Sequence, residues 1–425
     1  MLRLALTTAA LLCVSSSAQG QGWLSDRDQT EGDGIKLGAF ELHPGIGSEV
    51  GYNTNVFLGD VGQDSGVLRV TPHLYLQSSK GGIDLEARDL NFRTGVSSSL
   101  IHYFATEANT DVSLKQDAKL EVRLSRIVSV SLEERLQRSI DPFSDAIAPN
   151  AGNEPVDTDR LQLNVGGRLG LNSPGGLLKG GVGYTLGIDH FEGDVFAANR
   201  NQSHTVTADS SYQFLPKTAF FWNSGLRFHR YVNKDIRDVA ERNDSTNVNS
   251  RVGINGGLTP RLGFTLSAGY AAGFFEDDND YESVIAQIQA RWRTSQTTAL
   301  TLAYERAFNS AFQGNFARTD RFKAQGQALF GGVFMLRASA ELTMVDFGRD
   351  DLLSDDRNDI HLLTGLSGEY RFTDWFALTA EVGYLQNFTD FTFTFDDDAD
   401  PNTPEVVDEA KYNRFSAWLG VRAFL

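Results

Sequence analysis

Seven histidines are scattered along the 425-residue chain, and none forms a pair at the spacing of a protein metal site. They are His43, His73, His102, His190, His204, His229 and His361. The single cysteine, Cys13, excludes both a disulfide framework and a cysteine-based zinc site. From these residues we expect no dedicated metal site and no cofactor.

Only one run approaches a serine-nucleophile motif. Gly365-Leu366-Ser367-Gly368 falls short of G-x-S-x-G and lies inside a strand-like segment. The glycines at Gly45–Gly47 and Gly180–Gly183 lack the strand–loop–helix context of a phosphate-binding loop. We therefore predict no catalytic residue. An enzyme assembled on the rim from residues far apart in the sequence stays open as an alternative.

Acidic runs are the next candidates, and the one at 396–402 begins like a calcium loop. Pro401 stands where an EF-hand needs glycine, and Val407 where it needs glutamate, so an EF-hand is rejected. Similar runs lie at 276–280 and 350–356. We interpret them as solvated loops. Loose divalent bridging to lipopolysaccharide phosphates or to a secreted acidic polymer is the alternative.

The remaining charged residues alternate with apolar ones. Between Val112 and Leu124, every second residue is apolar apart from Gln116, and the residues between them are Ser113, Lys115, Asp117, Lys119, Glu121 and Arg123. The same alternation occurs at 320–330, 334–344 and 414–425. A period of two is typical of a β-strand with one apolar face. These segments of about 11–15 residues are long enough to cross a bilayer, whereas strands of soluble sandwiches average about 5–6.

Connections of two kinds separate these segments. Short turns are predicted at Ser78–Gly82, Ser125–Ile127, Asn172–Gly176, Leu215–Lys217, Leu258–Arg261, Thr294–Thr298, Gly331–Val333 and Phe372–Trp375. Longer, more acidic loops are predicted at 53–65, 105–111, 140–157, 191–199, 232–243, 276–281, 312–316, 348–357 and 395–409. We therefore predict an all-β fold, a single antiparallel transmembrane β-barrel of about 18 strands with short periplasmic turns and longer extracellular loops. The count falls to about 16 if weak segments such as 83–104 are misread.

If the apolar residues face lipid, the charged residues between them line the lumen. The predicted lumen-lining set is Arg69, Lys115, Asp117, Lys119, Glu121, Arg123, Glu133, Arg135, Arg227, Arg291, Arg293, Arg321, Lys323, Arg337, Glu341, Glu381, Arg414 and Arg422. At this strand number the lumen is watery and charges stay hydrated. Both signs are mixed, which favours a channel for a hydrophilic solute or polymer. The alternative is that these charges only keep the scaffold solvated.

Aromatic residues gather near the predicted strand ends, as two interfacial girdles would. Toward the turns are Phe214, Trp292, Phe330, Phe334, Tyr370, Trp375 and Phe376. Toward the loops are Tyr52, Tyr103, Phe104, Phe191, Tyr231, Phe274, Phe275, Tyr281, Phe308 and Phe388. The alternative is that aromatics mark strand ends beside a soluble core.

The two ends of the chain point to export. Residues 1–18 are expected to be a signal peptide, 19–36 a flexible periplasmic segment, and 37–425 the outer-membrane barrel. The last strand carries Trp418, Gly420, Ala423 and Leu425 in the pattern of an outer-membrane assembly signal, so barrel assembly machinery is an expected partner. A net charge of −17 excludes nucleic acid as a partner, and a mean hydropathy of −0.27 excludes a helical membrane protein.

One stretch carries a family resemblance. Gly38-Ala39-Phe40 with Pro44, then Gly51-Tyr52-Asn53-Thr54-Asn55-Val56-Phe57 and Leu68-x-Val70-x-Pro72-x-Leu74, resembles the "putative beta-barrel porin" families of proteobacteria. The resemblance implies a pore that secretes an exopolysaccharide or capsule-type polymer together with a periplasmic polysaccharide export protein. It also implies contact with outer-membrane lipid and lipopolysaccharide. A general diffusion or uptake porin for small hydrophilic solutes is the alternative.

Overall fold

The computed structural model describes most of the chain from Gly32 onward. The described residues are 32, 34–56, 58–59, 61–78, 83–85, 88–105, 110–139, 159–192, 197–232, 244–276, 280–310, 316–348, 357–395 and 406–425. The expected signal peptide and most of each acidic run lie outside them. Within these ranges, no helix combines the length and apolar character needed to cross a membrane.

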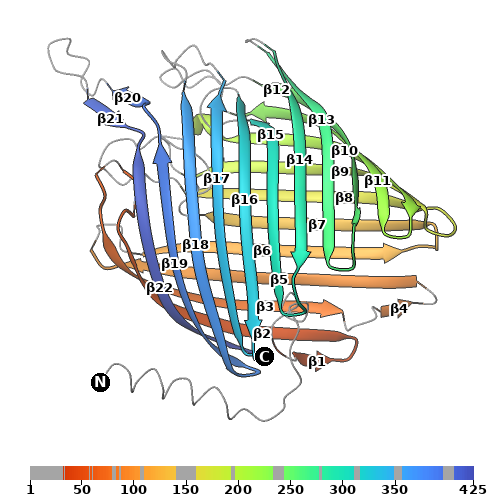
Figure 1. Cartoon of the computed structure of the whole chain (residues 1–425), viewed down its shortest axis with the longest axis horizontal. Helices are drawn as coiled ribbons and strands as arrows, with labels where there is room; N and C mark the ends of the chain where they lie inside the picture. The colour runs from red at the N-terminus through yellow and green to blue at the C-terminus, as the bar shows by residue number, and fades with distance from the viewer. Residues whose placement is uncertain are drawn as a thin grey trace.

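Eighteen long antiparallel strands of 12–16 residues make up most of the described chain (Figure 1). They are β2 (Phe40–Asn53), β3 (Ser65–Ser78), β5 (Arg88–Tyr103), β6 (Thr110–Arg123), β7 (Val128–Ser139), β8 (Arg160–Asn172), β9 (Leu178–Phe191), β10 (Asn201–Leu215), β11 (Thr218–Tyr231), β12 (Ser245–Gly257), β13 (Leu262–Phe275), β14 (Tyr281–Arg293), β15 (Thr298–Ser310), β16 (Phe316–Phe330), β17 (Phe334–Phe347), β18 (Asn358–Thr373), β19 (Phe376–Phe388) and β22 (Tyr412–Phe424). β22 pairs with both β19 and β2, which closes the sheet. The prediction of an 18-stranded barrel is confirmed. The segment 83–104 supplies the full strand β5, so the count of 16 is wrong.

The short turns within the described residues lie where the sequence predicts them, and the one predicted at Ser78–Gly82 lies mostly outside those residues. The connection from β8 to β9 contains Pro174, Gly175 and Gly176, and both glycines have positive φ angles of 88° and 73°. A residue with a side chain is strained in this conformation, which explains why glycine stands there. At the turn from β6 to β7, the Ser125 hydroxyl accepts hydrogen bonds from the backbone amides of Ile127 and Val128. Local turn chemistry therefore determines where these strands end.

A short strand precedes the barrel. β1 (Ile35–Leu37) pairs with Phe40–Leu42 of β2. Residues 35 and 36 of the segment expected to be flexible thus lie in a strand, while the flexibility of residues 19–36 stays a prediction. β1 forms because pairing between β2 and β22 begins only at Gly45 with Phe424, which leaves the first residues of β2 with an edge that β1 covers. Three further short strands, β4 (Ile83–Leu85), β20 (Thr392–Phe395) and β21 (Val406–Glu409), extend connections of the barrel.

Strand register determines which side chains share a face. Directly opposed residues in neighbouring strands point to the same side, and every second residue along a strand does so too. A hollow of about 840 Å³ is lined by Arg93, Lys115, Arg135, Arg168 and Thr207, among others, which come from β5 to β10. The opposite parity of the same strands carries exposed apolar side chains such as Leu132, Leu169 and Val182, as a lipid-facing surface does. This charged face is therefore the inner one.

The predicted aromatic girdles need one correction. On the turn side, Trp292 and Phe330 are about half exposed on the outside of the barrel. On the loop side, five of the predicted residues share the inner face instead, namely Tyr103, Phe191, Tyr231, Phe275 and Tyr281. The reason is that every second residue of a strand faces the same side. Each of these five residues is an even number of positions from an inward charged residue of its strand, or lies opposite an inward residue of the paired strand. The loop-side girdle prediction is wrong for these five residues.

Candidate functional site

The register places all eighteen residues predicted to line the lumen on the inner face. Arg69 is on β3, Lys115, Asp117, Lys119, Glu121 and Arg123 are on β6, Glu133 and Arg135 on β7, Arg227 on β11, Arg291 and Arg293 on β14, Arg321 and Lys323 on β16, Arg337 and Glu341 on β17, Glu381 on β19, and Arg414 and Arg422 on β22. Two groups are brought into ion pairs within the set. Lys119 lies 2.9 Å from Glu133, and Glu341 lies 3.2 Å from Arg321 and 3.6 Å from Lys323.

Two inner-wall ion pairs that reach across an intervening strand, Arg168 with Asp209 and Arg422 with Glu369, were not predicted from the sequence. Arg168 of β8 donates hydrogen bonds to Asp209 of β10, and their closest atoms are 2.7 Å apart. The strand between them, β9, contributes Gly181 and Gly183 at the positions in register with the pair. Because these glycines have no side chains, the guanidinium reaches across β9. A run of glycines could have signalled such a crossing, but only the register identifies the partners.

The inner wall is net basic, although the chain as a whole carries a charge of −17. Among strand residues whose side chains are described, nineteen Lys and Arg face inward against thirteen Asp and Glu. The basic residues are Arg69, Arg93, Lys115, Lys119, Arg123, Arg135, Arg160, Arg168, Lys179, Arg227, Arg251, Arg291, Arg293, Arg321, Lys323, Arg337, Arg371, Arg414 and Arg422. The acidic residues are Glu41, Glu49, Asp111, Asp117, Glu121, Glu133, Asp189, Asp209, Glu305, Glu341, Asp359, Glu369 and Glu381. The acidity of the chain therefore resides outside this wall.

The inner wall also differs from side to side. Charged residues occupy every inward position of β6 except Ser113, whereas the inward positions of β13 carry only small residues, hydroxyls and one phenylalanine. The strands beside β13 add amides such as Asn247, Asn249, Gln287 and Gln289, together with three arginines. A second inner hollow of about 490 Å³ lies between β10 and β15. A solute in the lumen would thus meet a row of charges along β6 and neutral groups along β13.

The loop after β2 folds over the inner wall at the extracellular mouth. Asn53 accepts a hydrogen bond from the backbone amide of Asn55. The Asn55 side chain exchanges two hydrogen bonds with Gly59 and donates a third to the carbonyl of Asn413 on β22. Leu58 then packs against Leu385 and Tyr412, which are inner residues of β19 and β22. Asn53 and Asn55, which belong to the motif of the family resemblance, therefore hold this loop against the inner wall.

A buried ionic cluster lies at the same end of β18. Arg357 is 2.6 Å from Asp359, and both side chains are essentially inaccessible. The rings of Phe347 and Phe391 lie 4.8 and 5.1 Å from the guanidinium. Asn387 donates hydrogen bonds to Asp359 and to the carbonyl of Ala410. These buried hydrogen bonds connect the bases of neighbouring loops and restrict their relative positions.

The outer face is apolar with a few polar exceptions near the loop ends of the strands. Arg306 and Tyr304 hydrogen-bond to Asp320, and Arg318 pairs with Asp346. The assumption that only apolar residues face outward is wrong at these positions. Reciprocal pairing explains how they are tolerated, because a lone charge facing lipid is costly.

Beyond the end of β9, hydrogen bonds from Arg138 lower the pKa of Glu192 below its usual range.

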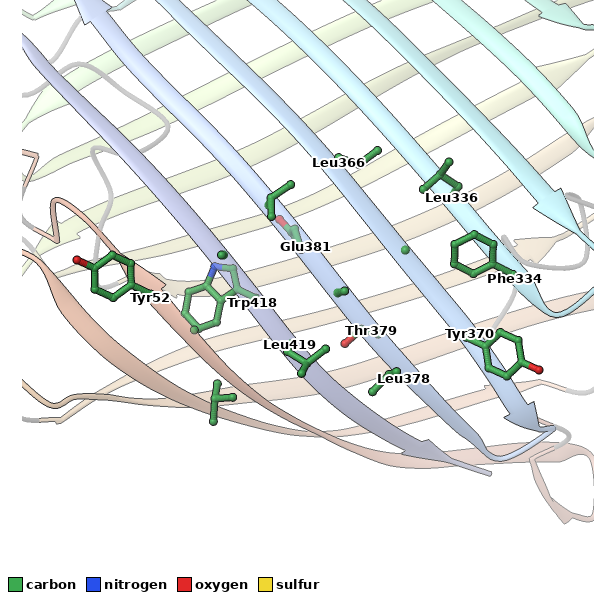
Figure 2. A pocket seen from close by; sticks show the side chains of 16 residues that line it. Tyr52, Phe334, Leu336, Leu366, Tyr370, Leu378, Thr379, Glu381, Trp418 and Leu419 are labelled. Atoms are coloured by element: carbon green, nitrogen blue, oxygen red, sulfur yellow. The ribbon is translucent and has the colours of Figure 1, made fainter. Parts of the chain in front are cut away.

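An apolar hollow lies on the outer face near the seam that closes the barrel. Figure 2 shows its labelled side chains, among them Leu336, Leu366, Leu378 and Leu419, on adjacent strands. Its volume is about 610 Å³. Small residues such as Gly368 and Ala417 form its floor because their short side chains leave space above the strands. Such a face suits contact with lipid acyl chains, not with water.

The residues of the predicted assembly signal lie at this seam. Trp418 and Gly420 face inward, whereas Ala423 faces outward. A Cβ atom on Gly420 would lie 2.4 Å from the Glu49 side chain and 2.9 Å from the carbonyl of Ser48, which explains the glycine by the close approach of β2. The role of these residues, with Leu425, as an assembly signal stays a prediction.

The sequence matches one protein-family model over residues 29–399, described as "Putative beta-barrel porin 2". The chain belongs to this family. It is therefore an outer-membrane β-barrel of the porin type. Among curated proteins, none has a matching sequence.

Several solved structures are similar to this porin. Acinetobacter baumannii OccAB4 is 11% identical with a TM-score of 0.47, and the alignment covers 91% of this chain and 98% of that one. Pseudomonas aeruginosa OccK7 (OpdD) gives the same identity and TM-score, with coverage of 91% and 99%. The FrpB iron transporter of Neisseria meningitidis is 10% identical with a TM-score of 0.44, covering 90% and 81%. At this level of similarity, any statement about the transported solute depends on the residues of this chain.

Proposed function

We propose that this porin is the outer-membrane pore through which an exopolysaccharide or capsule-type polymer leaves the cell. The observation that carries the proposal is an inner wall with charged or hydrogen-bonding residues on almost every strand. Barrels of 16–18 strands leave an aqueous channel, so these groups stay hydrated. A hydrated polymer in transit needs many weak contacts that it can leave as readily as it enters, and mixed polar side chains supply them.

A periplasmic polysaccharide export protein is the proposed partner. The family resemblance at Tyr52–Phe57 motivates this choice. Such a partner would dock at the short turns on the periplasmic side and deliver the polymer to the lumen. It would also keep the pore from leaking small solutes when no polymer is present.

A second function has one specific observation in its favour. The loop held by Asn55 lies against inner residues of β19 and β22, and a loop inside the lumen suits small hydrophilic solutes better than a wide polymer. A general diffusion or uptake porin is therefore the competing proposal.

Deletion of the gene distinguishes the two proposals. An export pore predicts loss of surface polysaccharide, unchanged uptake of small antibiotics, and recovery of the polymer on plasmid complementation. Intact polymer together with reduced uptake of small solutes would instead support the diffusion porin. In parallel, stable conductance steps in planar bilayers are expected from the purified barrel, and their complete absence would contradict both proposals.

A further inference from the structure

The 840 Å³ hollow on the inner face of β5 to β10 concentrates basic side chains. Arg93, Lys115, Lys119, Arg135 and Arg168 all line it. Its acidic inner residues are Asp117 and Glu133, with Asp209 beside it on β10. This part of the wall therefore has an excess of positive charge.

Two of these cations stand without an ion-pair partner. Lys119 pairs with Glu133 at 2.9 Å, Arg168 with Asp209 at 2.7 Å, and Arg93 lies 3.9 Å from Asp117. Within the described part of the chain, no carboxylate lies within 4.0 Å of Lys115 or Arg135, and neither donates a hydrogen bond. Their charges are thus directed at the lumen.

Lys115 and Arg135 are also close to each other. Lys115 opposes Gln137 and Asp117 opposes Arg135, so the two cations are diagonal neighbours on β6 and β7. Diagonal neighbours in an antiparallel pair are about 7–8 Å apart at the backbone, within reach of long side chains. One carboxylate can therefore contact both, and a guanidinium binds carboxylates with two parallel hydrogen bonds.

The adjoining strands leave room beside this pair of cations. β8 contributes Gly166 and Asn164, and β9 contributes Gly183 and Thr185. Thr207 of β10 adds a second hydroxyl. Small residues leave space for a ring, and amide and hydroxyl groups can hydrogen-bond to the hydroxyls of a sugar.

From this arrangement we propose that Lys115 and Arg135 form a binding subsite for the carboxylate of an acidic sugar, and that the exported polymer is a uronate-type polysaccharide. The inference rests on the proposed export function and adds the chemical class of the polymer. Other anions compete for the same charges, but the neighbouring amide and hydroxyl groups favour a carboxylated sugar over a simple ion.

The test measures binding of an oligogalacturonate to the folded barrel in detergent by calorimetry, and block of its conductance in planar bilayers. A neutral maltooligosaccharide of equal length and inorganic phosphate serve as comparison ligands at constant ionic strength. The double variant Lys115→Gln/Arg135→Gln is expected to weaken oligogalacturonate binding about tenfold or more. Arg135→Gln alone is expected to give an intermediate loss.

The matched control is Arg291→Gln/Arg293→Gln, which removes the same charge from the inner face of β14. It is expected to retain binding, which separates a local subsite from general attraction to a basic lumen. Heat-modifiable gel mobility checks that each variant is folded. Equal affinity in wild type and the Lys115/Arg135 variant, or equal binding of the neutral sugar or phosphate, would overturn the subsite. Because calorimetry does not require conduction, a barrel that binds oligogalacturonate but shows no pore would contradict the export function and not the subsite.

Discussion

Individual glycines decide which side chains can meet on the inner wall. Gly181 lets the guanidinium of Arg168 lie over β9, since a Cβ atom there would be 2.4 Å from one of its nitrogens. Gly269 on β13 has a different neighbour. A Cβ atom there would lie 2.1 Å from the carbonyl oxygen of Ser250, and backbone cannot move aside as a flexible side chain does. The two glycines are alike in sequence but differ in what they tolerate.

This contrast gives a paired prediction. Gly181→Val is expected to assemble, because Arg168 swings away and loses an exposed ion pair worth about 0–1 kcal/mol. Gly269→Val is expected to assemble poorly, because β12 and β13 must separate. Heat-modifiable mobility of the outer-membrane protein compares them. Similar amounts of folded Gly181→Val and Gly269→Val protein would contradict the packing described for these glycines.

A second residue-scale prediction concerns the mouth. Asn55→Ala removes three hydrogen bonds of a buried side chain, each group costing about 1–3 kcal/mol when left unsatisfied. The loop is then expected to leave the lumen, and single-channel conductance is expected to rise. Asn413→Ala is the control, because Asn55 uses only the backbone carbonyl at that position. Unchanged conductance of Asn55→Ala, or an equal rise in both variants, would exclude a narrowing role for this loop.

At the scale of elements, each strand has one face for water and one for lipid. β6 shows this most regularly, because Lys119 pairs with Glu133 across to β7 while Leu120 opposes Leu132 on the other face. A shift of register by one residue would exchange the two faces completely. The assigned register is therefore open to a direct mutational test.

Leu120→Arg is expected to block assembly, whereas Lys119→Leu is expected to be tolerated. An arginine facing lipid near mid-strand costs about 2–4 kcal/mol, but a leucine in a watery lumen costs little. Folded protein on an unheated gel is the measurement. If both variants assemble equally well, the facing of β6 is wrong.

For the whole molecule, the distribution of charge matters more than its sum. The chain is strongly acidic, yet the inner wall has nineteen basic side chains against thirteen acidic ones, by the register given above. The low-dielectric barrel wall focuses the electric field of the inward charges on the lumen. The sign of these charges therefore favours entry of ions of the opposite sign.

Anion selectivity is the expected consequence. In a potassium chloride gradient, the reversal potential of the open pore is expected to have the sign that favours chloride. The preference should weaken as salt rises, because screening shortens the reach of the wall charges. Arg291→Gln/Arg293→Gln should reduce it at low salt. A cation-selective pore would show that charges outside the inner wall dominate permeation.

The strands, their turns and the alternation of their faces could be predicted from local patterns in the sequence. These features are local: a period of two, a proline or glycine at a turn, and a strand length that matches a bilayer are all encoded within about 15 consecutive residues. Lys119 and Leu120 could be assigned to opposite faces for this reason. The strand count followed from the number of such segments.

Contacts between residues far apart in the sequence could be identified only from the tertiary structure. Arg168 and Asp209 are 41 positions apart, and Asn55 bonds to a residue 358 positions away. Such neighbours depend on the register of strand pairs and on where the barrel closes, which no local pattern contains. The lack of a described carboxylate within 4.0 Å of Lys115 or Arg135 depends on register in the same way. So do the inward-facing Tyr281 and the outward pairs of Arg306 and Arg318. The face on which a side chain lies can be predicted from the alternation within one strand. A contact between two side chains depends on the relative positions of two strands.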